Sequence, residues 1–182
     1  MAEKNILGKI LFTQEDITRR AKEIAAQIDR DYEGEEVILL GTLKGSILWF
    51  ADILKYTNVD TKIDFITASS YGSSTSSSGV VKITYEPRIN MYNKHVLVIE
   101  DIIDTGNTLK YLTAKLAERG PKSVKICTLL NKESRRVADL HADYVGFEVD
   151  DLFVIGYGLD YDQRYRGLPY ISYLDESDVD AL

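Results

Sequence analysis

An apolar segment that runs directly into a cluster of acids constrains the fold of this chain more than any other feature. Residues 96–109 read VLVIEDIIDTGNTL. The first part is a continuous apolar run, which is typical of a strand buried on both faces in a parallel sheet. Glu100 and Asp101 end the strand predicted over 95–100, and a helix is predicted over 107–119. The segment therefore predicts a strand, a loop and a helix, the unit from which parallel α/β sheets are built.

Helical and strand patterns alternate along the rest of the chain. An amphipathic helix is predicted over 13–30, where the Thr13 hydroxyl can cap the first turn, and a second helix over 47–56. Further strands are predicted at 37–40, 62–68, 80–85, 124–130, 144–148 and 153–157. Most of these strands are apolar throughout, which indicates a largely parallel sheet covered by helices. No linker divides the sequence, so we expect one domain over 1–182.

The loop after the strand at 95–100 has the residues needed to bind a phosphate. Gly106 lets the backbone approach a ligand closely, and the first turn of the following helix offers unpaired N–H groups to an anion. The hydroxyl groups of Thr105 and Thr108 add donors, and Asn107 lies between Gly106 and Thr108 at the helix start. We therefore expect these four residues to hold a phosphate group.

Three acids lie beside the predicted phosphate loop. Glu100 and Asp101 are adjacent, and Asp104 follows after two apolar residues. Carboxylates in this position suit ribose hydroxyls or a hydrated magnesium ion. An alternative is that Asp104 and Thr105 only cap the helix, as acids and hydroxyls commonly do. Capping leaves the other two acids unexplained, so we expect a site for a phosphorylated ribose.

Composition and motifs exclude several other classes of function. The net charge of −7 is opposite to the basic footprint of most nucleic-acid-binding proteins, so we expect no nucleic acid partner. Because no apolar run reaches membrane-spanning length and the N-terminus lacks an apolar signal core, we expect a cytoplasmic protein without a membrane partner. Cys127 is the only cysteine and lies in an apolar run, which predicts a buried, inert thiol. Neither a Walker loop nor a dinucleotide-binding glycine motif is present.

The stretch EDIIDTGNT at residues 100–108 resembles the phosphoribosyl-pyrophosphate (PRPP) signature of type I phosphoribosyltransferases. Three further segments resemble the hypoxanthine–guanine branch of that family. The resemblance implies an α/β fold, a largely parallel twisted sheet flanked by helices, with a small hood formed by about residues 1–15 and 145–182. It also implies a purine salvage enzyme, which transfers 5-phosphoribosyl from PRPP to N9 of hypoxanthine, and of guanine, giving IMP or GMP and pyrophosphate.

Two of these segments are assigned by the resemblance to pyrophosphate binding and to a lid over the site. Lys44 and Gly45 follow the strand at 37–40, and the resemblance assigns them, with Arg166, to pyrophosphate. Taken alone, Lys44 could equally be a solvated loop lysine. Ser70 and Tyr71 resemble the start of a mobile lid over the site, whereas the Ser/Gly-rich composition of residues 69–79 fits a flexible spacer equally well.

Residues 145–167 resemble the purine-binding part of the family nearly throughout. The resemblance places the ring of Phe153 against the purine, directs backbone groups of Val154 to the base edge, and assigns Asp160 to a second magnesium ion. It assigns to Lys132 the hydrogen bond that the 6-oxo oxygen of the purine accepts. Without the resemblance, Phe153 and Val154 would be core residues and Lys132 a surface lysine.

In the mechanism that the resemblance implies, Asp104 is the general base at purine N7, and Glu100 and Asp101 hold the ribose hydroxyls or their Mg²⁺. Family members form homodimers or homotetramers, so we expect one of these. Three alternatives remain: a regulator with the same PRPP loop that binds RNA or DNA, a xanthine-preferring enzyme, and a nucleotide-binding module without catalysis. The last would be expected to lack Asp104 or Arg166, and both are present.

Overall fold

Five parallel strands and one antiparallel strand form the central sheet of this computed structural model, which describes residues 9–70 and 81–174. The strand order is β4-β3-β2-β5-β6-β7, and only the β3–β4 pair is antiparallel. The strands are β2 (Glu36–Thr42), β3 (Asp60–Ser70), β4 (Val81–Tyr85), β5 (His95–Ile103), β6 (Ser123–Asn131) and β7 (Tyr144–Glu148). The largely parallel sheet is the one predicted.

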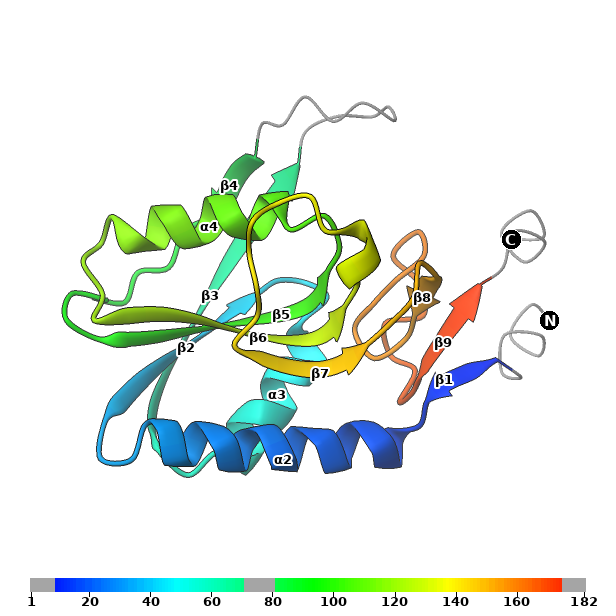
Figure 1. The fold of residues 1–182 in the computed structure, drawn as a ribbon, viewed down its shortest axis with the longest axis horizontal. Helices are drawn as coiled ribbons and strands as arrows, with labels where there is room; N and C mark the ends of the chain where they lie inside the picture. Colours follow the sequence, from blue (N-terminus) through cyan, green and yellow to red (C-terminus); the bar gives the residue numbers. More distant parts are fainter. Residues whose placement is uncertain (1–8, 71–80, 175–182) are drawn as a thin grey trace.

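Helices cover both faces of this sheet (Figure 1). On one side lie α2 (Gln14–Asp31) and α3 (Ile47–Tyr56), and on the other lies α4 (Asn107–Ala117). Successive residues of a strand point to opposite faces, and β2 shows the consequence: Leu39 packs with α2 and α3, and Leu40 packs with α4. Burial on both faces explains why this strand is apolar throughout.

The first turn of α2 is fixed by the cap that the sequence predicts. The N–H group of Asp16 donates to Thr13 Oγ1 at 3.1 Å, and the N–H group of Thr13 donates to Asp16 Oδ2 at 3.3 Å. A reciprocal cap of this kind satisfies two of the N–H groups that a helix start leaves open and contributes about 1 kcal/mol. A short helical turn, η1 (Glu133–Arg135), follows β6.

A second, three-stranded sheet forms the hood. It consists of β1 (Ile10–Phe12), β9 (Ile171–Leu174) and β8 (Phe153–Ile155), with antiparallel pairs β1–β9 and β8–β9. Figure 1 shows this sheet beside the carboxyl ends of the central strands. The predicted hood boundary at residue 145 is wrong, because residues 145–148 pair with β6 in the central sheet.

Several element ends also differ from the predictions. β5 continues to Ile103 because Ile102 and Ile103 still pair with β6, so Glu100 and Asp101 lie within the strand. β3 continues to Ser70 through pairing with β4, beyond the predicted end at residue 68. The strand predicted over 153–157 ends at Ile155, α4 ends two residues early, and Val80 lies outside the described residues. Strand ends depend on the partner strand, which local patterns do not contain.

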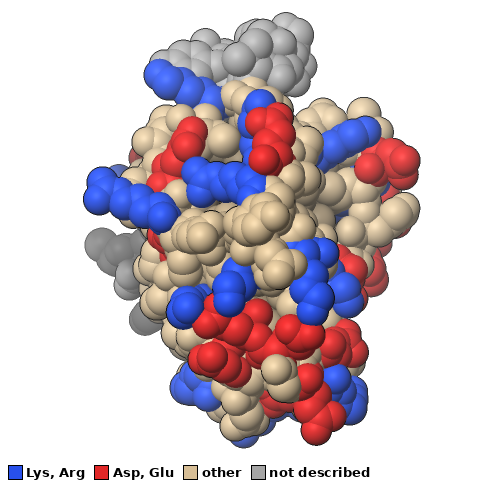
Figure 2. Space-filling view, turned by 90° about the vertical axis from the view of Figure 1, so that its left-hand side faces the viewer, with Lys and Arg blue, Asp and Glu red and all other residues tan. Residues whose placement is uncertain are grey.

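The opposite end of the molecule, where the parallel strands begin, is a mixed charged surface (Figure 2). Lys62 and Lys94 both pair with Glu36, at 2.7 and 2.9 Å, and Lys122 pairs with Glu35 at 2.6 Å. Charges of both signs are interspersed there. Among the described residues, no helix is both long and apolar enough to cross a membrane.

Candidate functional site

The two loops predicted to bind the ligand meet where the strand order reverses. β2 and β5 are neighbours, and the chain leaves them in opposite directions, toward β3 and toward β6. A crevice forms at such a switch point, beyond the carboxyl ends of the strands. The loop after β2 contains Lys44 and Gly45, with a cis peptide bond between Leu43 and Lys44, and the loop after β5 begins at Asp104. Both loops open onto this crevice.

Glu100 and Asp101 lie partly buried at this crevice, next to the end of β2. The hydroxyl group of Thr42 donates to Glu100 Oε1 at 2.8 Å and so links the two strands. Burial raises the pKa of Glu100 well above its usual range, and the like charge of Asp101 adds to this effect. A cation or ribose hydroxyl groups beside the two carboxylates would offset both effects.

The start of α4 has the geometry expected of a phosphate site. Gly106 is the N-cap residue, with a φ of 79°, and no side-chain capping hydrogen bond is present at this end of the described helix. The N-cap position therefore belongs to Gly106, and neither Asp104 nor Thr105 occupies it. The loop encloses a cavity of about 180 Å³ lined by residues between Glu100 and Leu109. The N–H groups of Val137 and Ala138, in the segment after η1, both donate to Thr105 O at 3.0 Å and so hold this loop in place.

A second cavity, of about 270 Å³, brings together the residues predicted for pyrophosphate and magnesium. Its lining consists of Thr42, Leu43, Lys44, Gly45, Ala68, Glu100, Asp101, Thr108, Leu112, Asp160 and Arg166. Arg166 pairs with Asp160 at 2.7 Å and donates to Gly158 O at 2.7 Å. Lys44 is exposed and donates to Gln163 Oε1 at 3.1 Å. The cavity therefore has two cationic side chains and three carboxylates around it.

The carboxylates of this cavity fit a magnesium ion that keeps part of its water shell. Within residues 9–70 and 81–174, no group of three or more His, Cys, Asp or Glu side chains is gathered closely enough to form a complete metal site. Glu100 and Asp101 are adjacent, whereas Asp160 is engaged by Arg166. Mg²⁺ is commonly bound by one or two carboxylates, with water and substrate phosphates as its other ligands. The residues present fit that arrangement.

A third cavity, of about 580 Å³, lies between the end of β6 and the hood. Its lining consists of Ile102, Asp104, Lys132, Arg135, Asp151, Leu152, Phe153, Val154, Leu159 and Leu174. It is large enough for a purine base and has apolar walls with a few charged groups. The three cavities adjoin, because Glu100 and Thr108 line the first and second, and Asp104 lines the first and third.

The three predicted purine-binding residues differ in their burial. Lys132 is buried, with 7% of its surface exposed, so the alternative of a surface lysine is wrong. Its ammonium group lies 3.8 Å from the carboxylate of Asp151. Phe153 is 48% exposed at the cavity and is not a core residue, whereas Val154 is buried, as a core residue would be, with its backbone in β8. The ring of Phe153 meets the edge of Tyr161, with centroids 5.8 Å apart.

The predicted lid lies mostly outside the described residues. Ser70 is the last residue of β3, and Tyr71 lies beyond it, outside the part of the chain that the structure describes. Ala68, two residues before the end of β3, lines the second cavity. The described part of β3 therefore ends close to this cavity, at the residue where the predicted lid would begin.

Four polar residues in or beside these cavities were not predicted: Thr42, Arg135, Asp151 and Gln163. Thr42 ends β2 and bonds to Glu100, while Gln163 accepts hydrogen bonds from Lys44 and Arg166. Arg135 lies 2.9 Å from Asp104. One signal was available for Arg135, since charged residues that follow a strand at its carboxyl end are candidates for the same crevice. The other contacts join segments far apart in the sequence.

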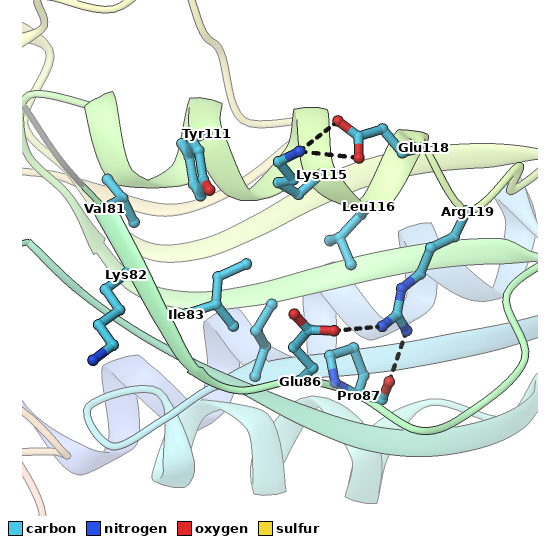
Figure 3. A pocket seen from close by; sticks show the side chains of 11 residues that line it. Val81, Lys82, Ile83, Glu86, Pro87, Tyr111, Lys115, Leu116, Glu118 and Arg119 are labelled. Atoms are coloured by element: carbon cyan, nitrogen blue, oxygen red, sulfur yellow. Dashed lines mark hydrogen bonds and ion pairs between the residues drawn. The ribbon is translucent and has the colours of Figure 1, made fainter.

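A larger cavity, of about 730 Å³, lies away from these residues, between α4 and β4 (Figure 3). Ion pairs line its rim, Lys115 with Glu118 at 2.7 Å and Arg119 with Glu86 at 3.2 Å. Each of these cations is already neutralised by an acid beside it. None of the predicted site residues lines this cavity.

Comparison with known proteins agrees with this geometry. A family model described as a phosphoribosyl transferase domain matches residues 9–162. A hypoxanthine-guanine phosphoribosyltransferase of Bacillus subtilis (strain 168) is 46% identical over 171 residues, which are 94% of this chain and 95% of that protein. One of Streptococcus thermophilus (strain CNRZ 1066) is 46% identical over 176 residues, 97% of each chain. The crystal structure of a hypoxanthine phosphoribosyltransferase from Staphylococcus aureus matches with a TM-score of 0.93 and 44% identity, covering 97% of this chain and 96% of that chain.

Proposed function

This chain belongs to the hypoxanthine-guanine phosphoribosyltransferase family, and on that premise we propose that it transfers the 5-phosphoribosyl group of PRPP to N9 of hypoxanthine, and of guanine. The products are IMP or GMP and pyrophosphate. The observation that carries the proposal is the set of three adjoining cavities at one switch point, with Asp104 and Glu100 in their shared walls. The first cavity suits the 5′-phosphate, the second suits pyrophosphate and the third suits a purine. A single PRPP molecule and a purine base would therefore meet where the three cavities adjoin.

In the proposed reaction, the bond between C1′ and the pyrophosphate oxygen breaks and its electron pair leaves with pyrophosphate. Purine N9 forms the new bond to C1′ while the N7 proton passes to the carboxylate of Asp104. The amides of Thr105 to Thr108 hold the 5′-phosphate. Lys44, Gly45 and Arg166 bind the departing pyrophosphate, where the planar guanidinium suits phosphate oxygens.

Glu100 and Asp101 are the residues that we propose to hold Mg²⁺ with the ribose hydroxyls, and Asp160 is proposed for a second ion. When bound, Mg²⁺ supplies charge neutralisation to the leaving pyrophosphate. Its removal with a chelator should therefore stop the reaction and its return should restore it.

At the purine end, Lys132 donates to the 6-oxo oxygen, the ring of Phe153 stacks on the base, and backbone groups of Val154 contact its edge. Stacking of this kind contributes roughly 1–3 kcal/mol per base. Adenine presents an amino group in place of the 6-oxo oxygen, so it cannot accept the Lys132 hydrogen bond. Ser70 and Tyr71 remain proposed as the start of a lid that excludes water.

Three further parts of the proposal concern the chain as a whole. We propose one domain over 1–182, a homodimer or homotetramer, and a cytoplasmic location. Cys127 is buried and free, and burial raises the pKa of its thiol to about 12, as expected of an inert core cysteine. Light scattering of the purified protein would measure the oligomeric state.

The test is an assay of the purified protein with PRPP, Mg²⁺ and each of hypoxanthine, guanine, xanthine and adenine. We expect nucleotide and pyrophosphate from hypoxanthine and guanine, and little from adenine. A preference for xanthine would favour the alternative enzyme. Binding of PRPP without turnover of any base would contradict the proposed reaction and favour a binding module.

A further inference from the structure

One arginine in the purine cavity has no part in the reaction described above. Arg135 ends the turn η1 after β6, and its side chain is 46% exposed. Its Nε atom lies 2.9 Å from Oδ1 of Asp104, and its Nη1 atom lies 3.2 Å from both carboxylate oxygens of Asp151. The guanidinium group therefore joins a carboxylate at the end of β5 to one in the segment before β8.

These contacts extend across the cavity to Lys132. Asp151 lies 3.8 Å from the ammonium group of Lys132, so four charged groups alternate in sign: Asp104, Arg135, Asp151 and Lys132. The two ends of this row are the groups proposed to contact purine N7 and the 6-oxo oxygen. Glu100 and Asp104 both line the adjoining cavity at the start of α4. Arg135 lies inside the row of four charges and contacts both of its acids, Asp104 and Asp151.

We propose that Arg135 is a positioning residue for purine transfer, acting through Asp104. The pair with Arg135 engages one oxygen of the Asp104 carboxylate and leaves the other for the purine. Asp151, on the other side of the guanidinium, limits where Arg135 can move. This inference rests on the proposed role of Asp104 in the reaction.

The contact between Arg135 and Asp104 depends on the charge of the guanidinium group more than on hydrogen-bond geometry. It is an ion pair that lacks the geometry of a hydrogen bond, whereas the contacts with Asp151 are hydrogen bonds. A lysine at position 135 would retain the charge and lose the planar fork. A glutamine would retain polarity and lose the charge. The two substitutions therefore separate an effect of charge from an effect of shape.

The experiment compares Arg135→Gln, Arg135→Lys and Asp104→Asn with the double variant that carries Arg135→Gln and Asp104→Asn. We expect Arg135→Gln to lower kcat/KM for hypoxanthine about 10-fold, with the Kd of pyrophosphate unchanged. This loss is smaller than the roughly 100-fold cost of displacing a catalytic group by about 1 Å, because the Asp104 carboxylate itself is retained. Arg135→Lys should retain most of the activity. In the Asp104→Asn background, Arg135→Gln should have almost no further effect, since residues that act as a unit are not additive.

Arg19→Gln is the matched control, because Arg19 also pairs with two acids but lies on α2. Melting temperatures of all variants separate loss of positioning from loss of folding. Additive losses in the double variant, or an Arg135→Gln enzyme as active as the wild type, would overturn the inference. The proposed function fails separately, if the wild-type protein makes no nucleotide from any 6-oxopurine.

Discussion

Gly45 packs directly against the carboxylate of Asp101, so closely that a Cβ atom at position 45 would overlap Asp101 Oδ2. The loop after β2 and the end of β5 therefore touch at the cavity proposed for pyrophosphate and magnesium. The carbonyl group of Gly45 is in turn so close to Gly158 that a side chain there would meet it. Three separate segments thus approach each other at one point, and glycine makes the approach possible.

We expect Gly45→Ala to remove most of the activity. The added methyl group must displace Asp101 or the loop that carries Lys44, and misplacement of such groups by about 1 Å costs roughly 100-fold in rate. The measurement is kcat/KM for PRPP. Gly167→Ala is the matched control, because no atom beyond its two chain neighbours lies within 4 Å of its added Cβ position. Equal activity of the two variants would contradict the close contact at Asp101.

Substitution of Asp104 by asparagine tests the proposed base. Asparagine has the same shape and cannot accept the N7 proton, so kcat with hypoxanthine and PRPP should fall by about 100-fold or more. The melting temperature should change little, since the side chain is 44% exposed. An Asp104→Asn protein with intact folding and unchanged kcat would mean that another group takes the proton.

Lys132→Ala should relax the choice of base. The ammonium group is buried at the purine cavity, and a site built to donate to an oxygen discriminates strongly against a base that lacks it. The ratio of kcat/KM for hypoxanthine to that for adenine should fall at least 10-fold, mainly through the loss with hypoxanthine. Lys110→Ala, an exposed lysine on α4, should leave the ratio unchanged. A constant ratio in the Lys132 variant would remove its proposed role.

His95 lies at the end of the molecule away from the site, and its lowered pKa should make the free energy of unfolding depend on pH. Burial lowers the pKa of His95, and the positive charge of Lys122 adds to this. Its Nδ1 atom is 2.7 Å from Ser123 Oγ. As the pH falls through the usual histidine value of about 6.5, the unfolded chain binds the proton before the folded chain does. The free energy of unfolding should therefore decrease between pH 7 and pH 5.

Replacement of His95 by glutamine should remove this part of the pH dependence. The free energy of unfolding in urea, measured at several pH values in that range, gives the slope for each protein. The exposed His141, replaced by glutamine, serves as the control. The slope should be smaller for His95→Gln than for the wild type and the control, and equal slopes would contradict the assignment.

The spacing of apolar residues predicted most helices and strands of this protein, because that spacing follows from which side of each element is buried. The apolar face of α2 and the apolar run of β5 both pack into the core. They can therefore be recognised in the sequence without knowing which elements they pack against. By contrast, the strands β1 and β9 have only three and four residues and form through pairing between the two ends of the described chain. No local signal distinguishes such segments from loops.

The strand, loop and helix start proposed for the phosphate could be predicted from the sequence alone, because they are adjacent in the chain and need no distant partner. The contact of Gly45 with Asp101 and the row of charges through Arg135 could not be predicted in this way. They depend on which strand ends meet at the switch point, and that is set by the order β3-β2-β5-β6 in the sheet. Tertiary structure decided these contacts because distances between side chains on different loops arise only when the strands that carry them are paired.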